Sequence, residues 1–251
     1  MTKTNIEWTD YTWNIARGCT KVDEDCKFCY MYRDSFNNTR YDPLQVVRTK
    51  TVFNRPLKIE EPSKIFTCSL TDFFHEAIDS YRHEAWDIIR QCPQHTFQIL
   101  TKRPERIKEC LPPFWKEIRG RIWLGTSIGS QDSIHRLDAL LDNNIFETIF
   151  FLSLEPLHGK IILPRQTLKW NIDWVIVGGE SGNETGKYRY RPCELEWIES
   201  IVSQCKTARV PVFVKQLGTH LSKKLGMTDR HGGNIDEFPE HLQIRQFPNT
   251  I

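Results

Sequence analysis

The chain has 251 residues, of which 39% are hydrophobic and 26% are charged, and its formal net charge is +2. This is an ordinary globular composition, and so small a net charge neither demands nor excludes a nucleic-acid partner. Because there is no run of about 18 apolar residues, and because the N-terminus lacks the apolar core of a signal peptide, we expect no transmembrane helix, no membrane partner and a cytoplasmic location.

The first motif along the chain is a group of three cysteines, Cys19, Cys26 and Cys29, in the pattern Cys-x6-Cys-x-Phe-Cys. In a reducing compartment they are not expected to form disulfides. Three thiolates leave one position of a metal cluster open, whereas a structural metal site normally has a fourth protein ligand. Three interpretations stay open: a [4Fe–4S] cluster with one open iron, a zinc site completed by a histidine such as His75 or His158, and unrelated cysteines.

Short runs rich in β-branched residues recur along the chain, and each is too short for a helix. They suit strands that are buried on both faces. A first strand is expected around residues 12–17. The later runs are residues 64–70, 96–101, 121–126, 148–153, 173–178 and 210–215.

Apolar residues spaced three and four apart predict helices between these strands. Pro104 fits the first turn of a short helix that ends before Pro112. The longer stripes are Ile78, Tyr81, Ala85 and Ile89; Ile134, Leu137 and Leu141, with Ser130 as the N-cap; and Ile198, Ile201, Val202 and Cys205.

Strands that alternate with helices predict a parallel sheet with right-handed crossovers. The number of runs favours a partial (β/α) barrel of about six or seven parallel strands, in residues 1–217. Residues 218–251 are rich in turn residues and predict a loop-rich cap or a short β-ribbon rather than a helix. This tail is either a cap, with the barrel mouth as its candidate position, or an extension of the same domain.

Polar residues follow the C-terminal ends of the predicted strands, where parallel α/β folds assemble their active sites. The alternative is that each strand simply ends in a polar residue, but six consecutive ends carry charged or hydroxyl groups. These residues are Ser69, Asp72, Lys102, Arg103, Ser127, Glu155, Gly178, Gly179, Glu180, Ser181, Lys215 and Gln216.

The Cys-x-Phe-Cys element and the partial barrel after it resemble the radical S-adenosylmethionine superfamily, although the first gap here has six residues, longer than in most members. Within that superfamily the chain is similar to the largely uncharacterised phage-associated three-cysteine-motif family. The closer resemblance rests on residues 6–14, 18–22, 178–182, 232–233, 237–240 and 245–248 and on the two later cysteines.

The resemblance implies that Cys19, Cys26 and Cys29 hold a [4Fe–4S] cluster whose open iron binds S-adenosylmethionine. One electron, from a reductant such as flavodoxin or ferredoxin, would yield a 5′-deoxyadenosyl radical that abstracts hydrogen from the substrate. Cys68 and Cys193 are candidate hydrogen donors to a substrate radical, with burial in the core as the alternative. The candidate cofactor-binding residues are Ser69, Asp72, Ser127, Gly178, Gly179, Glu180 and Ser181.

Basic and tyrosine residues interleave from Lys187 to Arg191, a composition that suits phosphates and stacked bases but also occurs in solvated loops. With the phage association, it favours a nucleobase in nucleic acid or a nucleotide as the substrate. Glu155 could bind substrate or a cofactor hydroxyl, or act as a base. The other substrate-binding candidates are Lys102, Arg103, Arg189, Arg191, Lys215 and Gln216. The alternatives are modification of a peptide or partner protein, and a zinc-stapled nucleic-acid-binding module without catalysis.

Overall fold

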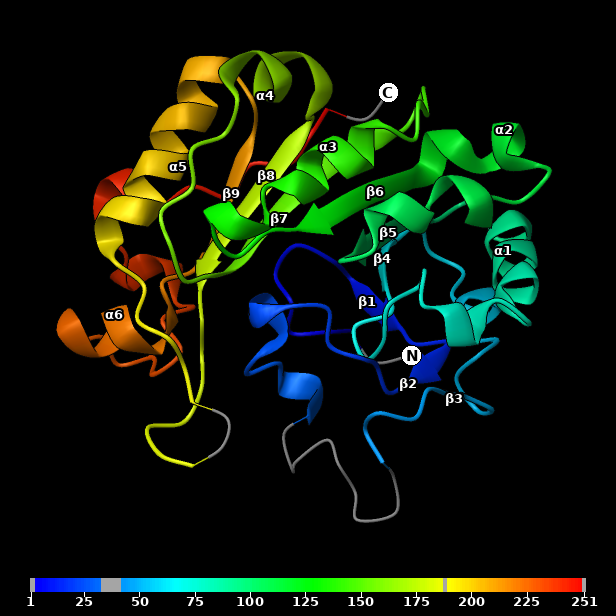
Figure 1. Cartoon of the computed structure of the whole chain (residues 1–251), viewed down its shortest axis with the longest axis horizontal. Coiled ribbons are helices and arrows are strands. Elements are labelled where there is room, and N and C mark those ends of the chain that lie inside the picture. The colour runs from blue at the N-terminus through cyan, green and yellow to red at the C-terminus, as the bar shows by residue number, and fades with distance from the viewer. Residues whose placement is uncertain (1–2, 33–41, 187–188, 250–251) are drawn as a thin grey trace.

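A computed structural model of the chain describes residues 3–32, 42–186 and 189–249. Within these residues, seven parallel strands form one sheet in the order β1-β4-β5-β6-β7-β8-β9. Figure 1 shows the sheet curled into an open half-barrel. Each strand pairs with the next strand of the sheet along the chain, as parallel strands joined by right-handed crossovers do. The predicted partial (β/α) barrel is therefore confirmed.

The observed elements follow the predicted ones closely. The strands of the sheet are β1 (Tyr11–Trp13), β4 (Lys64–Thr67), β5 (Thr96–Thr101), β6 (Ile122–Ser127), β7 (Ile149–Leu157), β8 (Trp174–Gly179) and β9 (Val212–Gln216). A separate antiparallel pair joins β2 (Ala16–Arg17) to β3 (Val47–Arg48). The helices are α1 (Arg82–Gln91), α2 (Trp115–Ile118), α3 (His135–Leu141), α4 (Arg165–Asn171), α5 (Leu195–Ala208) and α6 (Gly218–Lys224). The stretch after Pro104 forms short 3-10 turns rather than one helix.

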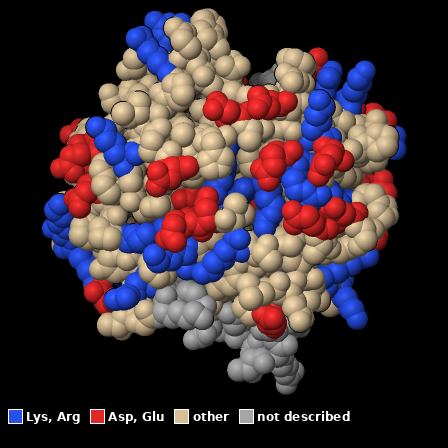
Figure 2. Space-filling view, in the orientation of Figure 1, with Lys and Arg blue, Asp and Glu red and all other residues tan. Residues whose placement is uncertain are grey.

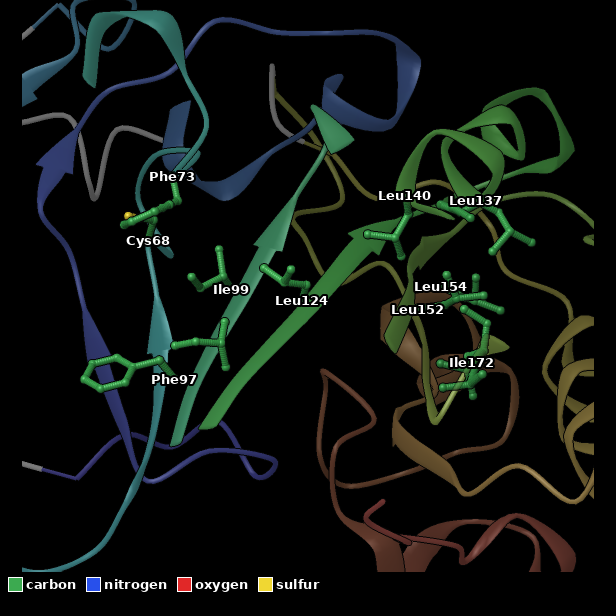
Figure 3. Close-up of a cluster of buried hydrophobic side chains, with 14 of the residues drawn as sticks. Cys68, Phe73, Phe97, Ile99, Leu124, Leu137, Leu140, Leu152, Leu154 and Ile172 are labelled. Atoms are coloured by element: carbon green, nitrogen blue, oxygen red, sulfur yellow. The ribbon is translucent and has the colours of Figure 1, made fainter. Parts of the chain in front are cut away.

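Alternate residues of the strands divide between two apolar clusters. Because the side chains of a strand point alternately to the two faces of its sheet, the clusters mark those faces. Val175 and Val177 of β8 belong to the larger cluster together with Leu137 and Leu140 of α3. Figure 3 shows part of this cluster, and in Figure 1 α3, α4 and α5 lie along one side of the sheet. The larger cluster is thus the core between the sheet and its helices.

The smaller cluster fills the inner face of the half-barrel with aromatic rings. The ring centre of Trp174 lies 5.6 Å from that of Trp123, 5.7 Å from Phe151 and 6.2 Å from Trp8. Trp8 precedes β1, and its carbonyl accepts a hydrogen bond from Gln98 Nε2 at 3.2 Å. The N-terminal arm therefore folds into the half-barrel. With the rings of the smaller cluster it forms a floor near the N-terminal ends of the strands, here called the aromatic floor.

The tail differs from its prediction at its beginning, because residues 218–224 form the helix α6. Thr219, Leu221 and Ser222 of this helix are buried, and the helix packs against β8. A seven-residue helix that begins at a glycine is too short to show a clear apolar period. Tertiary packing, rather than local pattern, decides its structure.

The end of the tail lies along the free edge of β9. Val214 N donates to Ile244 O at 2.8 Å, and Gln246 N donates to Val212 O at 3.1 Å. Phe247 then stacks on Trp174, with ring centres 5.4 Å apart. This part of the tail covers the edge and the floor of the sheet, not its mouth.

Among the described residues, no helix is long and apolar enough to cross a bilayer. Figure 2 shows basic and acidic side chains interleaved across the face in view.

Candidate functional site at the mouth of the half-barrel

The segment that carries the three cysteines, residues 18–32, is here called the cysteine loop. It follows β2, and Gly18 N donates to Leu70 O, just after β4, at 3.1 Å. Gly18 has a φ of +93°, and an added Cβ would lie 2.0 Å from Gln45 O. Only glycine satisfies both conditions, so this residue fixes how the loop leaves β2 and reaches the C-terminal end of the sheet.

The three cysteines of the loop are free thiols; Cys26 is buried, and Cys19 and Cys29 are half-buried. Burial, and after it the charge of Asp72, raises the pKa of Cys19 to about 12, although Arg103 acts in the opposite direction. Burial also raises the pKa of Tyr32, and after burial the charges of the three cysteines contribute most to that rise. All three thiols are therefore close enough to act electrostatically on the Tyr32 phenol. A metal that binds them must displace their protons.

Whether the loop fits a metal group depends on its donors. Within residues 3–32, 42–186 and 189–249, no group of three or more His, Cys, Asp and Glu side chains is placed so that it could hold a metal ion. The donors themselves are three thiols of one loop, the soft ligands that iron–sulfur clusters and zinc take. Both histidines predicted as a fourth zinc ligand also touch the loop. His75 Nε2 lies 2.9 Å from Thr20 Oγ1, and His158 Nε2 lies 2.7 Å from Asp25 Oδ1.

Asp72 and Arg103, predicted to bind cofactor and substrate, support the cysteine loop. Arg103 Nη2 donates to Thr20 O at 3.0 Å and to Thr20 Oγ1 at 2.8 Å, while its Nη1 lies 3.4 Å from Asp72 Oδ2. Asp72 also accepts hydrogen bonds from Thr101 Oγ1 at 2.8 Å and from Lys102 N at 2.9 Å. Both charged groups are buried and satisfied by protein, which favours a structural role for them.

Neither Asp25 nor Arg136 is among the predicted site residues, yet both lie at the loop. Arg136 Nη1 donates to Asp25 Oδ2 at 2.7 Å, and Arg136 also pairs with Asp23. Burial alone would raise the pKa of Asp25, but hydrogen bonds from His158 and Ser133 and the charge of Arg136 hold it below its ordinary range. The available signal in the sequence is the acidic run of residues 23–25 directly before Cys26.

A second group of charged side chains stands above the aromatic floor. Lys215 Nζ lies 3.1 Å from Glu155 Oε1, and these side chains are 24% and 13% exposed. Lys102 Nζ donates to Ser127 Oγ at 2.8 Å, and Ser127 Oγ in turn donates to Glu155 O at 2.8 Å. Four of the predicted site residues, from four different strand ends, are therefore brought together. Lys102, Ser127, Glu155 and Lys215 are here called the mouth residues. An ammonium has three donors, so each lysine keeps capacity for an anion.

The Gly178-Gly179 pair ends β8 beside this group. A Cβ on Gly178 would lie 2.7 Å from Glu155 Oε1, and one on Gly179 would lie 2.2 Å from Leu217 O. Gln216 Nε2 donates to Gly179 O at 2.7 Å. The glycines thus allow close packing of two strand ends and leave room for the Glu155 carboxylate.

Glu180, the next residue, is bound by protein. Arg191 Nε and Nη2 each lie 2.9 Å from its carboxylate oxygens, and Arg191 N donates to it at 2.7 Å. Arg191 Nη1 also donates to Glu24 O of the cysteine loop at 2.7 Å. Two predicted ligand-binding residues are therefore a bidentate ion pair that ties the end of β8 to the loop.

The remaining candidates lie at the edge of this site or in the core. Ser69 Oγ accepts from Asn14 Nδ2 at 3.0 Å, Ser181 is half-buried and Arg189 is exposed. Cys68 and Cys193 belong to the larger apolar cluster; burial raises the pKa of both, that of Cys193 to about 12. Of the predicted basic and tyrosine run, Lys187 and Tyr188 lie outside the described residues.

A family model described as a protein of unknown function, DUF5131, matches residues 3–243. The chain belongs to the DUF5131 family. The match includes the cysteine loop, every strand of the half-barrel and the mouth residues of this DUF5131 chain. No curated protein and no solved structure matches it.

Proposed function

We propose that this DUF5131 protein is a radical S-adenosylmethionine enzyme in which Cys19, Cys26 and Cys29 hold a [4Fe–4S] cluster. The proposal rests mainly on one observation: a single loop carries three thiols at the C-terminal end of a parallel half-barrel, where such folds keep their active sites. When bound there, the cluster would pass one electron, from a reductant such as flavodoxin or ferredoxin, to S-adenosylmethionine, so that a substrate hydrogen can be abstracted.

The residues of the mouth would bind and orient the reactants. Lys102 and Lys215 provide two ammonium groups for an anion, and Glu155 provides an acceptor for a donor group of the substrate or for a ribose hydroxyl. Ser127 and Gly178 are the proposed contacts nearest to them. The aromatic floor below, with Trp174 at 0% exposure, would keep water from the reacting hydrogen.

The substrate that this arrangement suits best is a nucleobase in nucleic acid or a nucleotide. Phosphate is a natural partner of the two lysines, and an exocyclic amine of a base is a natural donor to Glu155. A peptide or partner protein is the alternative substrate. Deuterium-labelled nucleic acid, nucleotide or protein from the host, supplied in turn, distinguishes them because only the true substrate transfers deuterium to 5′-deoxyadenosine.

The activity is tested with protein purified without oxygen, reconstituted with iron and sulfide and given dithionite and S-adenosylmethionine. We expect brown protein and release of methionine and 5′-deoxyadenosine. The triple variant Cys19→Ala, Cys26→Ala, Cys29→Ala should reduce both products to the level of the protein-free reaction. Cys110→Ala, a thiol outside the loop, is the matched control and should retain both. Product release that survives the triple variant would contradict the proposal.

A zinc-stapled nucleic-acid-binding module is the second candidate, and the contacts of His75 and His158 with the loop favour keeping it. It predicts colourless protein with one zinc per chain. It also predicts that the His75→Ala or the His158→Ala variant, after reconstitution with zinc, holds less zinc per chain than the wild type does. A protein that takes up iron and sulfide but no zinc excludes this module.

A further inference from the structure

A buried ion pair joins the cysteine loop, at the residue before Cys26, to α3. The side chains of Asp25 and Arg136 are each 2% exposed, and their closest nitrogen and oxygen atoms are 2.7 Å apart. The other oxygen of Asp25 lies 2.7 Å from His158 Nε2, and Gly129 N donates to Asp25 Oδ2 at 3.0 Å. Asp25 thus uses both carboxylate oxygens on groups outside the loop.

Two partners of Asp25, Gly129 and His158, follow two of the four strand ends that carry mouth residues. Gly129 follows β6, His158 follows β7, and His158 N donates to Gly129 O at 2.9 Å. Arg136 Nη1 also donates to Ser127 O, at the end of β6, at 2.8 Å. Asp25 is therefore the point at which the cysteine loop is fixed to β6 and β7.

The fit around this point is tight. A Cβ on Gly129 would lie 2.6 Å from Asp25 Oδ1 and 2.7 Å from His158 Nε2. A shift of either atom would disturb the hydrogen bond that joins His158 Nε2 to Asp25 Oδ1 at 2.7 Å. The Asp25 carboxylate is therefore closely packed against Gly129 and His158, directly before Cys26 in the chain.

We infer that Asp25 is a positioning residue that latches Cys26 against the ends of β6 and β7 and so sets where the proposed cluster stands relative to Ser127 and Glu155. This role rests on the proposed function, because positioning Cys26 matters for catalysis only if the three cysteines hold a cluster. The latch itself is a property of the metal-free chain. It predicts that Cys26, which is 9% exposed, stays protected from reagents only while Asp25 holds the loop.

The test measures alkylation of individual cysteines by iodoacetamide in metal-free protein, followed by peptide mass spectrometry. Asp25→Asn removes the charge that pairs with Arg136 and keeps the size of the side chain. Gly129→Ala keeps the charge of Asp25 but places a methyl group against the Asp25 carboxylate and His158. Both should raise the alkylation rate of Cys26 at least about tenfold, because breaking a buried ion pair favours local opening strongly. Glu24→Gln, at the exposed neighbour of Asp25, should leave that rate unchanged.

Cys193 and Cys205, both 0% exposed, serve as internal reporters of the folded core. An unchanged rate at Cys26 in both variants overturns the inference. So does a rise at Cys205 equal to the rise at Cys26, because the network would then belong to global folding and not to a local latch.

A second measurement links the latch to the cluster. After iron and sulfide reconstitution, Asp25→Asn should shift the midpoint potential or the electron paramagnetic resonance spectrum, whereas Glu24→Gln should not; an unchanged potential and spectrum overturn the positioning role. If the wild-type chain takes up no cluster while Cys26 still becomes reactive in both variants, the proposed function fails and the latch stands.

Discussion

A position can need glycine because its φ is positive or because a neighbouring atom occupies the place of a Cβ, and Gly18 meets both conditions. Its positive φ is costly for any residue with a Cβ, and the position that a Cβ would take lies against the Gln45 carbonyl. Gly226 has a φ of +68° but nothing within 4 Å, and Gly120 has open space and no positive φ. These residues separate backbone strain from close contact.

Replacement of each of these glycines by alanine should therefore give graded losses of stability. Gly120→Ala should be neutral or slightly stabilising, and Gly226→Ala should cost about 1 kcal/mol. Gly18→Ala should cost clearly more, because the chain must also move away from Gln45. Urea unfolding of the metal-free protein measures the series. Equal losses for Gly18→Ala and Gly226→Ala would mean that the close contact is relieved without cost.

The cysteines and most mouth residues could be chosen from the sequence, but their partners could not. Glu180, Arg191, Asp72 and Arg103 have the chemistry of ligand-binding groups, and each is held by another group of the protein instead. Opposite charges at neighbouring strand ends attract one another, and sequence position does not show which pairs form. Asp25 was missed for the same reason, since its partner Arg136 is far from it along the chain.

At the scale of elements, β-branched runs locate the strands well because a strand buried on both faces leaves a continuous apolar signal. The runs at 96–101 and 121–126 match β5 and β6 within one residue at each end. Helix α6 was missed because its burial against β8, and not its own period, makes it a helix. The path of the tail along β9 leaves no local pattern either.

The end of the tail protects an edge strand, which leads to a prediction. Truncation after Gln243 should expose the free edge of β9 and the ring of Trp174, so the protein should lose stability and associate. Phe247→Ala removes only the stacked ring and should cost about 0.5–1.5 kcal/mol without association. Thermal unfolding and light scattering measure both variants. A truncated chain that stays monomeric would show that the tail is not needed to cover this edge.

At the scale of the whole molecule, the core and the cysteine loop are separate. None of the three loop cysteines belongs to the larger apolar cluster, which runs between the sheet and its helices. The half-barrel should therefore fold without any metal, whatever the loop binds. In small zinc modules, by contrast, metal binding supplies the folding free energy.

The triple alanine variant of Cys19, Cys26 and Cys29 should accordingly keep its far-ultraviolet circular dichroism spectrum. Its midpoint of thermal unfolding should stay within about 3 °C of that of the metal-free wild type. Ile198→Ala, in the core on α5, is the reference and should cost about 2–5 kcal/mol. A triple variant that loses as much as Ile198→Ala would show that the loop is part of the core.

The contact between Trp8 and Trp174 has a consequence for synthesis on the ribosome. Because the sheet adds its strands in chain order, β1, β4 and β5 can pair as soon as they emerge. Trp8 can pack early only on Phe66 of β4, 4.7 Å away between ring centres, because Trp174 of β8, its other aromatic neighbour, is made much later. A nascent half-barrel therefore leaves Trp8 only partly covered until β8 arrives, so chaperones that bind exposed aromatic residues would find a target at this tryptophan.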